Sequence, residues 1–421
     1  MIGTFAKPAF TRTRLLFLAL AFVSPLAARP FGTKLILPPS GTGDTRGEGI
    51  NVHGHVVGNY TTPTNRVRAF IHRNGVSSDL PEPVGTTSSG ANGINASGVI
   101  VGSYRVTNLR ACVWDGNVLT ELPVPPGARD TVAHSINDAG LIVGSYTDAS
   151  LDTHVCIWQG GNLVYPVKPM GATYSAAFSV GNNGTFVGNY QSAGGNRACQ
   201  WGNAALVEVL PLPQGTTDSD VSGINNVGVA VGSAHSSMSL GQACVWQGAS
   251  VFTLPSPGTG HSSAIDVNDG GQIVGEFFAE GNMAGRAWFW ETGTPEFLPQ
   301  PAGAFTTTAA AINDAGQIVV NYSFNSAPSR AAILEEAFRP TVKISGRKKV
   351  VTSKSRVTIR GTTTDFVDRV NWEGKGSEGK AKGTKPWVLP YRPKPGRNLV
   401  RVTAAGPGGT SKSARVVIVQ H

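Results

Sequence analysis

Histidine is the side chain most often used for acid-base chemistry and metal binding near neutral pH, and this chain of 421 residues contains eight histidines. Only His53 and His55 stand close together in the sequence. A zinc site needs three or four protein ligands, and no third ligand accompanies this pair, so we interpret both as residues of a solvated turn. The chain also has no Gly-x-Ser-x-Gly elbow, phosphate-binding loop or His-Glu-x-x-His motif. The sequence therefore predicts no catalytic residue, no metal site and no cofactor.

Three aspartates occupy equivalent turns and raise the question of calcium, which binds clustered carboxylate oxygens. They are Asp138, Asp269 and Asp314. The corresponding turns elsewhere carry Val52, Ala96 and Asn226. Because a repeated calcium site would need a carboxylate in each turn, we expect these aspartates to make local hydrogen bonds to the turn backbone.

The strongest charge signal lies at the C-terminal end of the chain. Residues 338–421 contain 19 lysines and arginines against 4 aspartates and glutamates, a net charge of +15, whereas residues 29–337 carry a net charge of −9. A strongly basic domain attracts polyanions. The candidate polyanion-binding residues are Arg347, Lys348, Lys349, Lys375, Lys380, Lys382 and Lys385. A well-solvated domain surface accounts for the same charges, so both interpretations stay open.

Four cysteines share one sequence context, two residues before an aromatic tryptophan. They are Cys112, Cys156, Cys199 and Cys244. A disulfide requires Cα atoms about 4.4–6.8 Å apart, and equivalent positions of successive repeat units should be farther apart than this. We therefore expect free, buried thiols that pack as small hydrophobic side chains, and no metal site shared between them.

The elements that position these residues come from an internal repeat. The phrase INDAGLIVGSY at 136–146 occurs in seven variants, and successive copies lie 42 to 45 residues apart. Its asparagine is a structural repeat position, with Gly181 in the fourth copy and Asn51, Asn95, Asn137, Asn225, Asn268 and Asn313 in the others. Each unit also contains a run such as RACVW, a segment closing on Leu-Pro and a Ser/Ala/Gly-rich segment. Four short strands in about 44 residues predict a seven-bladed β-propeller.

Two features of the repeat predict its local geometry. The Asn-x-x-Gly segment predicts a tight hairpin, in which the glycine has a positive φ and the asparagine side chain bonds the local backbone. A second glycine lies inside the following strand, where it predicts the close approach of another backbone or packed face. These glycines are Gly58, Gly102, Gly144, Gly188, Gly232 and Gly275.

The two ends of the repeat array complement each other. The chain begins the array with a Leu-Pro strand around Leu35–Pro38 that has no first half before it, and the last unit stops after residues 330–336 without such a strand. We predict that the N-terminal strand completes the last blade and closes the ring.

The repeat unit resembles the HAF repeat of bacterial extracellular proteins. The resemblance rests on the Arg-Ala-aromatic-x-Trp run, whose nearest copy is Arg68-Ala69-Phe70, a polar turn, the Leu-Pro strand, the Ser/Ala-rich strand and the Ile-Asn-x-x-Gly-Gln-Ile-Val-Gly phrase, as in INDAGQIV at 312–319. The resemblance covers residues 30 to about 337. This chain has Arg, Gln or His where the name-giving histidine stands, and Leu-Pro where the usual copy has Leu-Gly. The resemblance implies secretion and a propeller-like array without an established set of catalytic residues.

The sequence divides into three parts. Residues 1–28 have basic residues, then the apolar run 15–23 and small residues, as a secretory signal peptide does. That run is too short to remain as a membrane span, and no later stretch reaches membrane length. Residues 29–337 form the predicted propeller of HAF-like repeats. Residues 338–421 alternate apolar and polar residues between Gly, Pro and Ser, which predicts a small antiparallel β-sandwich that resembles bacterial Ig-like domains. The predicted class is all-β.

Two classes of function remain. The first is a secreted or cell-surface-associated binding or structural protein, extracellular or periplasmic, whose propeller is a recognition platform and whose basic sandwich attaches to anionic polysaccharide or another envelope component. The alternative is an extracellular hydrolase or lyase that acts on polysaccharide in the propeller channel. An active site needs several non-equivalent residues in one place, whereas the recognisable residues here recur in successive units. We therefore predict a monomeric binding protein that is not an enzyme, and outside the cell we expect no nucleic acid partner.

Overall fold

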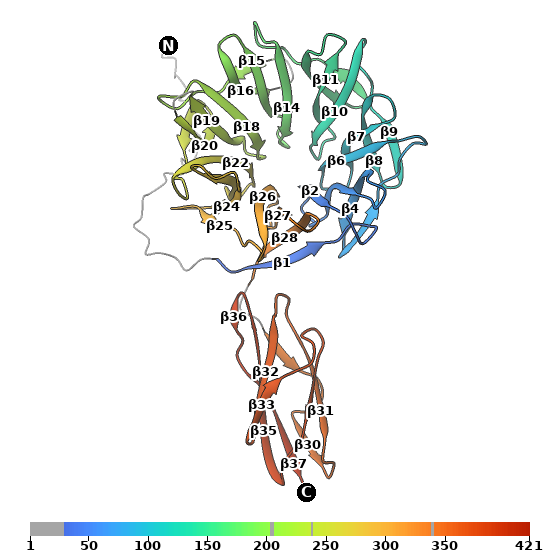
Figure 1. Cartoon of the computed structure of the whole chain (residues 1–421), viewed down its shortest axis with the longest axis vertical. Helices are drawn as coiled ribbons and strands as arrows, with labels where there is room; N and C mark the ends of the chain where they lie inside the picture. Colours follow the sequence, from blue (N-terminus) through green and yellow to red (C-terminus); the bar gives the residue numbers. More distant parts are fainter. Residues whose placement is uncertain (1–28, 203–205, 237–238, 338–340) are drawn as a thin grey trace, which may run out of the picture.

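The computed structural model describes residues 29–202, 206–236, 239–337 and 341–421, and the leader predicted for residues 1–28 lies outside this part of the chain. The described residues form β-strands joined by turns, with no helix among them, so none of them belongs to a helix able to cross a membrane. Figure 1 shows groups of strands arranged around a common axis and a separate C-terminal domain beyond them. The predicted all-β class is confirmed.

The strands of the larger part pair antiparallel within groups of four. The first group is β2 (Thr45–Ile50), β3 (Val56–Thr61), β4 (Val67–Arg73) and β5 (Val76–Asp79). The next is β6 (Ser88–Ile94), β7 (Ile100–Arg105), β8 (Leu109–Asp115) and β9 (Val118–Glu121). It is followed by β10 (Ala128–Ile136), β11 (Ile142–Asp148), β12 (Thr153–Gln159) and β13 (Asn162–Val164).

The later groups repeat this order. They are β14 (Tyr174–Val180), β15 (Phe186–Ser192), β16 (Gly195–Gly202) and β17 (Leu206–Val209); β18 (Asp218–Ile224), β19 (Val229–Ser236), β20 (Ser239–Gln247) and β21 (Ser250–Thr253); and β22 (Gly260–Val267), β23 (Ile273–Ala279), β24 (Arg286–Trp290) and β25 (Glu296–Phe297). A single parallel pair, Thr153 with Tyr174, joins the group of β10 to the group of β14 in one sheet.

The last group takes its fourth strand from the start of the chain. It contains β26 (Ala304–Ile312), β27 (Ile318–Phe324) and β28 (Arg330–Glu336), and β1 (Phe31–Ile36) pairs antiparallel with β28 from Phe31 opposite Glu336 to Ile36 opposite Ala331. This strand ends at Ile36, within the Leu35–Pro38 segment that the sequence indicated, because consecutive prolines follow at 38 and 39 and proline has no N–H to donate to a ladder.

Each innermost strand bends shortly before its hairpin. In β10 the pairing with β11 shifts register between Ala133 and Ser135, and the innermost strands of the other groups shift at equivalent points. A Cβ on Gly144 would lie 2.0 Å from the Val132 carbonyl oxygen, so the predicted close approach is confirmed. The hairpin glycine Gly140 has φ 79°, as predicted.

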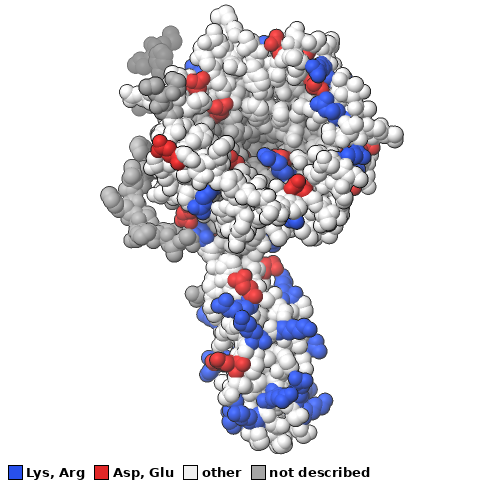
Figure 2. Space-filling view, viewed as in Figure 1, with Lys and Arg blue, Asp and Glu red and all other residues white. Residues whose placement is uncertain are grey.

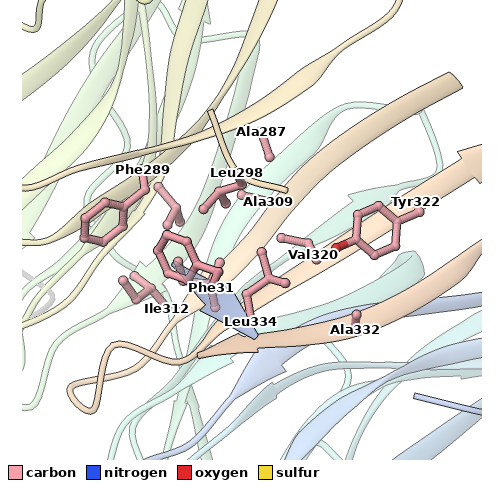
Figure 3. Close-up of a cluster of buried hydrophobic side chains, with 12 residues drawn as sticks. Phe31, Ala287, Phe289, Leu298, Ala309, Ile312, Val320, Tyr322, Ala332 and Leu334 are labelled. Carbon is pink, nitrogen blue, oxygen red and sulfur yellow. The ribbon is translucent and has the colours of Figure 1, made fainter. Parts of the chain in front are cut away.

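The hydrophobic cores lie between neighbouring groups. One core joins Val57 and Ile71 of the first group to Ile100, Cys112 and Trp114 of the second. Phe31 of β1 extends the last of these cores, where its ring centroid lies 5.8 Å from that of Phe289 (Figure 3). The four cysteines are free and buried, as the sequence predicted.

The C-terminal domain consists of two packed sheets. The smaller sheet has β29 (Val342–Ile344), β31 (Val357–Thr363) and β34 (Trp387–Tyr391). The larger has the order β30 (Lys349–Thr352), β37 (Ala414–Gln420), β35 (Gly396–Gly406), β32 (Arg369–Gly374) and β33 (Ser377–Lys380), with β36 (Gly409–Thr410) beside β35. Trp387 and Leu389 of one sheet pack against Val400 and Val416 of the other.

The purely antiparallel prediction for this domain is wrong at one strand, because β30 pairs parallel with β37. The chain reaches β30 from β29 of the opposite sheet rather than through a hairpin, and a crossover of this kind allows parallel pairing.

Candidate functional site

The repeat asparagines link neighbouring groups to one another. Asn137 is 4% exposed, and its Oδ1 accepts a hydrogen bond from the backbone N–H of Leu141 in its own hairpin. Its Nδ2 donates to the Gly181 carbonyl of the next group at 3.0 Å. The sequence predicted only the local bond. The same link to the next group is made by Asn51, Asn95, Asn225, Asn268 and Asn313, the last of which donates to the Asn51 carbonyl at 2.9 Å.

The turn aspartates also reach the neighbouring group, so the prediction of local turn bonding is wrong for them. Asp138 Oδ1 accepts from the backbone N–H of Ala96, and Asp269 Oδ1 accepts from that of Asn226, each at 2.8 Å. Asp314 Oδ1 accepts from the backbone N–H of Asp269 at 2.9 Å. The close packing of neighbouring hairpins brings one turn within reach of the next, which sequence alone does not show. Among the described residues no group of three His, Cys, Asp or Glu could hold a metal ion.

These hairpins surround a small cavity at one end of the central axis. It has a volume of about 170 Å³ and is lined by the repeat asparagines, their neighbouring turns and Asp266. Both carboxylate oxygens of Asp266 accept backbone N–H groups, Oδ1 from Val267 and Oδ2 from Ile312 of the next group, each at 2.9 Å. Burial raises the pKa of Asp266 to about 6. Ser179 occupies the equivalent position in β14, and its Oγ likewise accepts a hydrogen bond from the next group, from the Ile224 N–H at 3.3 Å. Asp266 therefore connects two groups as a structural acceptor.

Other titratable side chains are partly buried on the innermost strands and, in the case of Glu276, on β23. Burial raises the pKa of Glu276, an effect that the nearby Arg46 opposes. Arg46 is itself paired with Glu48 at 2.7 Å. Burial lowers the pKa of His134 to about 4, so its ring is neutral at pH 7, and it packs edge-on against Phe178 with centroids 5.6 Å apart. These residues are not repeated in the other units, and repeat analysis therefore overlooked them.

The nearest approach to a catalytic dyad in the described part lies on β12. His154 Nε2 is 3.0 Å from Asp148 Oδ2, and this contact lowers the pKa of Asp148. The other ring nitrogen of His154 faces the ammonium of Lys168 at 3.3 Å rather than a hydroxyl or thiol. A base of this kind has no nucleophile to activate, so the arrangement is a chain of polar contacts that joins Asp148, His154 and Lys168.

The predicted polyanion-binding residues are all exposed, but they fall into three sets. Arg347, Lys348 and Lys349 lie at β30, whereas Lys375 and Lys380 flank or end β33. These strands are the two edges of the larger sheet, with three strands between them, which separates them by about 19 Å. The remaining two, Lys382 and Lys385, lie nearer the smaller sheet: Lys382 bridges to Val388, and Lys385 pairs with Asp365 at 2.7 Å.

Arginines that the sequence analysis overlooked lie between these two edges. Arg397 and Arg401 of β35 are exposed and alternate with the buried Asn398, Val400 and Val402, so they share the outer face of the sheet. Arg401 stands directly opposite Arg415 of β37. Like charges opposite one another destabilise a sheet. The spacing RNLVR at 397–401 within an alternating strand was the signal for this face.

One carboxylate partly offsets the repulsion between Arg401 and Arg415. Glu373 of β32 accepts a hydrogen bond from Arg401 Nη1 at 2.9 Å, with both side chains about half exposed. Figure 2 shows cations spread over the C-terminal domain with few anions, whereas both signs are mixed over the strand groups. The outer face defined by Arg397, Arg401, Arg415 and Lys349, which we call the arginine face, is therefore suited to bind several anionic groups at once.

No protein-family model matches the chain, and no curated protein matches it. Solved structures similar to it include the β-propeller domain of the Trilobed protease from Pyrococcus furiosus, at 12% identity and a TM-score of 0.47, covering 74% of this chain and 95% of that one. YCF48 from Cyanidioschyzon merolae matches at 11% identity and a TM-score of 0.48, covering 73% and 99%. The six-bladed β-propeller lectin of Aleuria aurantia matches at 13% and 0.38, covering 65% and 100%. Similarities at this level concern the fold alone, and the strand groups around one axis are of the β-propeller type.

Proposed function

We propose that this chain is a secreted or cell-surface-associated binding protein, in which a closed seven-bladed propeller of HAF-type repeats is the recognition platform and a basic Ig-like sandwich attaches to anionic polysaccharide. The observation that carries the proposal is the arginine face. Arg401 faces Arg415 directly, and only one carboxylate, Glu373, accompanies them. A folded domain gains nothing from opposed arginines, whereas a carboxylate- or sulfate-bearing polymer bridges them.

Closure of the ring is supported at two levels. The ladder between β1 and β28 supplies the last group with its outer strand. The bond from Asn313 Nδ2 to the Asn51 carbonyl, 262 residues away in sequence, links the last hairpin to the first. A closed ring leaves fewer unpaired strand edges than an open array, and it presents its loops as one rigid surface for recognition.

The alternative is a hydrolase or lyase that acts on polysaccharide in the channel. It is supported by Glu276, whose raised pKa suits a general acid, next to Arg46 and its partner Glu48. A pair of carboxyl groups is what most enzymes that cleave glycosidic bonds use. If this alternative holds, the purified protein releases reducing ends or unsaturated products from an anionic polysaccharide, and Glu276→Gln abolishes the release.

Retention of the full secreted chain on immobilised polygalacturonate tests the main proposal. The protein should bind at low ionic strength and elute as salt rises toward about 0.5 M, where the screening length falls to about 4 Å. Replacing Arg401 and Arg415 with glutamine should lower the eluting salt concentration substantially. The matched control replaces Arg105 and Arg129 of the propeller, which removes the same total charge. Equal shifts for both double variants would show that net charge alone governs retention and would exclude a site on the arginine face.

A further inference from the structure

The C-terminal domain contacts the strand groups at the first strand of the chain. β1 lies on the side of the strand groups that faces this domain (Figure 1). Gly32 of β1 lies against the ring of Phe366, since a Cβ at position 32 would overlap that ring. Lys34 Nζ lies 5.2 Å from the centre of the same ring. Because Phe366 belongs to the loop between β31 and β32, these contacts join the two parts of the molecule.

The loop that carries Phe366 has an unusual backbone conformation. Phe366 has φ 56°, which is uncommon for a bulky residue. Contacts with the end of β35 hold it there: the Phe366 carbonyl oxygen occupies the place that a Cβ on Gly406 would take, and the Asp368 N–H donates to the Ala405 carbonyl at 2.9 Å. Strained residues that their surroundings fix in place are concentrated at ligand-binding and other functional sites.

A cavity of about 460 Å³ lies at this junction. Residues 31–34 of β1 supply part of its lining, and residues 364–368, Thr384, Lys385 and Pro407 of the C-terminal domain supply the rest. Pockets that hold small molecules have volumes of about 300–1,000 Å³ and occur preferentially at domain interfaces. Both parts of the molecule therefore contribute to a cavity of suitable size for a small ligand.

The positive charges of this cavity are already compensated. Lys34 pairs with Glu335 at 2.9 Å, and Lys385 pairs with Asp365 at 2.7 Å. The hydrogen bond from Lys385 lowers the pKa of Asp365, and the charge of Lys34 acts across the junction in the same direction. The exposed Asp368 forms no ion pair with another described residue. The cavity therefore differs from the arginine face, because it offers an anion no unpaired cation.

The remaining lining groups suit hydroxyl groups. The Thr364 hydroxyl accepts the Thr341 N–H at 3.0 Å and keeps its own proton to donate, and Thr384 adds a second hydroxyl. The carboxylate of Asp368 can accept several donors. An apolar ligand would leave these polar groups unpaired, which is costly, and an anion would meet the uncompensated carboxylate.

We propose that the junction cavity binds a neutral saccharide, whose hydroxyl groups donate to Asp368 and accept from Thr364 and Lys385. The site is separate from the arginine face and goes beyond the binding of anionic polysaccharide. Because β1 and the loop at 364–368 both line the cavity, the saccharide contacts both parts of the molecule.

Isothermal titration calorimetry of the full chain with cellotriose, maltotriose and xylotriose tests the proposal. At least one of these neutral saccharides should bind with a Kd below about 1 mM. The binding should persist in about 0.5 M salt, where the screening length is about 4 Å, because a neutral ligand is not held by long-range charge. If none of the three binds, the proposal is wrong.

Two variants locate the saccharide. Asp368→Asn should weaken binding about tenfold, since a charged acceptor makes the stronger hydrogen bond, whereas Glu378→Gln makes the same charge change on the exposed β33 and should leave binding unchanged. Gly32→Ala should displace the Phe366 ring and weaken binding to a similar degree. Its control is Leu35→Ala, at an exposed position of the same strand.

The outcomes separate this inference from the proposed function. Binding that is lost in Asp368→Asn but unchanged in Gly32→Ala would place the saccharide on the C-terminal domain alone and overturn the junction site. Equal weakening by Asp368→Asn and Glu378→Gln would overturn the role of Asp368. Retention on polygalacturonate depends on the arginine face, so it should survive both Asp368→Asn and Gly32→Ala, and its failure in the intact chain would contradict only the proposed function.

Discussion

The strand groups and the C-terminal domain use their polar side chains in opposite ways. In the groups, Asn137, Asp138 and Asp266 each bond the backbone of a neighbouring group, so that polar residues hold the array together. In the C-terminal domain, ion pairs engage few of the many described cations, among them Arg401 with Glu373 and Lys385 with Asp365. Ligand binding is therefore expected in the C-terminal domain, where charged side chains exceed the number that the fold requires. Substitutions in either region test this contrast.

The largest effect should come from removing the strand that completes the last group. Deleting residues 29–40 exposes the edge of β28 and removes the buried Phe31 and Ile36 from two cores. An unpaired edge next to an opened core favours aggregation. We expect a melting temperature lower by at least 10 °C, on the order of 5 kcal/mol, or insoluble protein.

The control for this deletion is Leu35→Ser, which alters an exposed residue of the same strand. Differential scanning calorimetry of both proteins provides the measurement. A deleted chain that unfolds at the temperature of the intact protein contradicts closure by β1.

The next effect concerns the links between groups. Asn137→Ala leaves the Leu141 N–H and the Gly181 carbonyl without their buried partner, which should cost about 2–4 kcal/mol. Urea unfolding measures the loss. Gly181→Asn, the reverse change at the exceptional repeat, should bring no gain, because its Cβ would lie 2.8 Å from the Asn225 carbonyl oxygen. An Asn137→Ala protein of unchanged stability would show that the asparagines are dispensable.

The features that the sequence predicted correctly are those that recur from one repeat unit to the next. Asn-x-x-Gly and the strand glycines encode hairpins and close backbone approach locally, so their geometry was predictable. The second bond of Asn137 depends on the distance to the next group, which only the assembled array determines. Glu276 gave no repeat signal, and its raised pKa comes from burial that the sequence does not contain. The spacing RNLVR places Arg397 and Arg401 on one face, but the opposition of Arg401 and Arg415 depends on a strand register that the sequence does not contain.

A smaller effect on stability is expected from substitution of Asp266. The other units have glycine, serine or alanine at the equivalent position, so Asp266 is the exception there. Its raised pKa means that the folded state disfavours the ionised carboxylate. The contribution of Asp266 to stability should therefore fall as the pH rises from about 4 to about 6, and stay low above that. Asp266→Ser, which copies Ser179, should raise stability at pH 7 by about 1–2 kcal/mol.

The measurement is the difference in the free energy of unfolding between the intact protein and the Asp266→Ser variant, followed from pH 4 to pH 7. This difference is needed because His134 titrates in the same range with the opposite sign: its lowered pKa means that stability is lost as the pH falls. A difference that does not change with pH would contradict the raised pKa of Asp266.

The smallest effect on stability separates the two regions most sharply. Arg415→Glu replaces the opposed arginines with an ion pair to Arg401, which should stabilise the protein by about 0.5 kcal/mol while lowering the salt concentration that elutes it from polygalacturonate. Arg397→Glu makes the same charge change opposite Val419, so it should weaken retention without adding stability. A structural role for Arg415 predicts the reverse, a loss of stability with unchanged retention. Stability gained and binding lost from one substitution would identify Arg415 as a residue kept for its ligand at the expense of the fold.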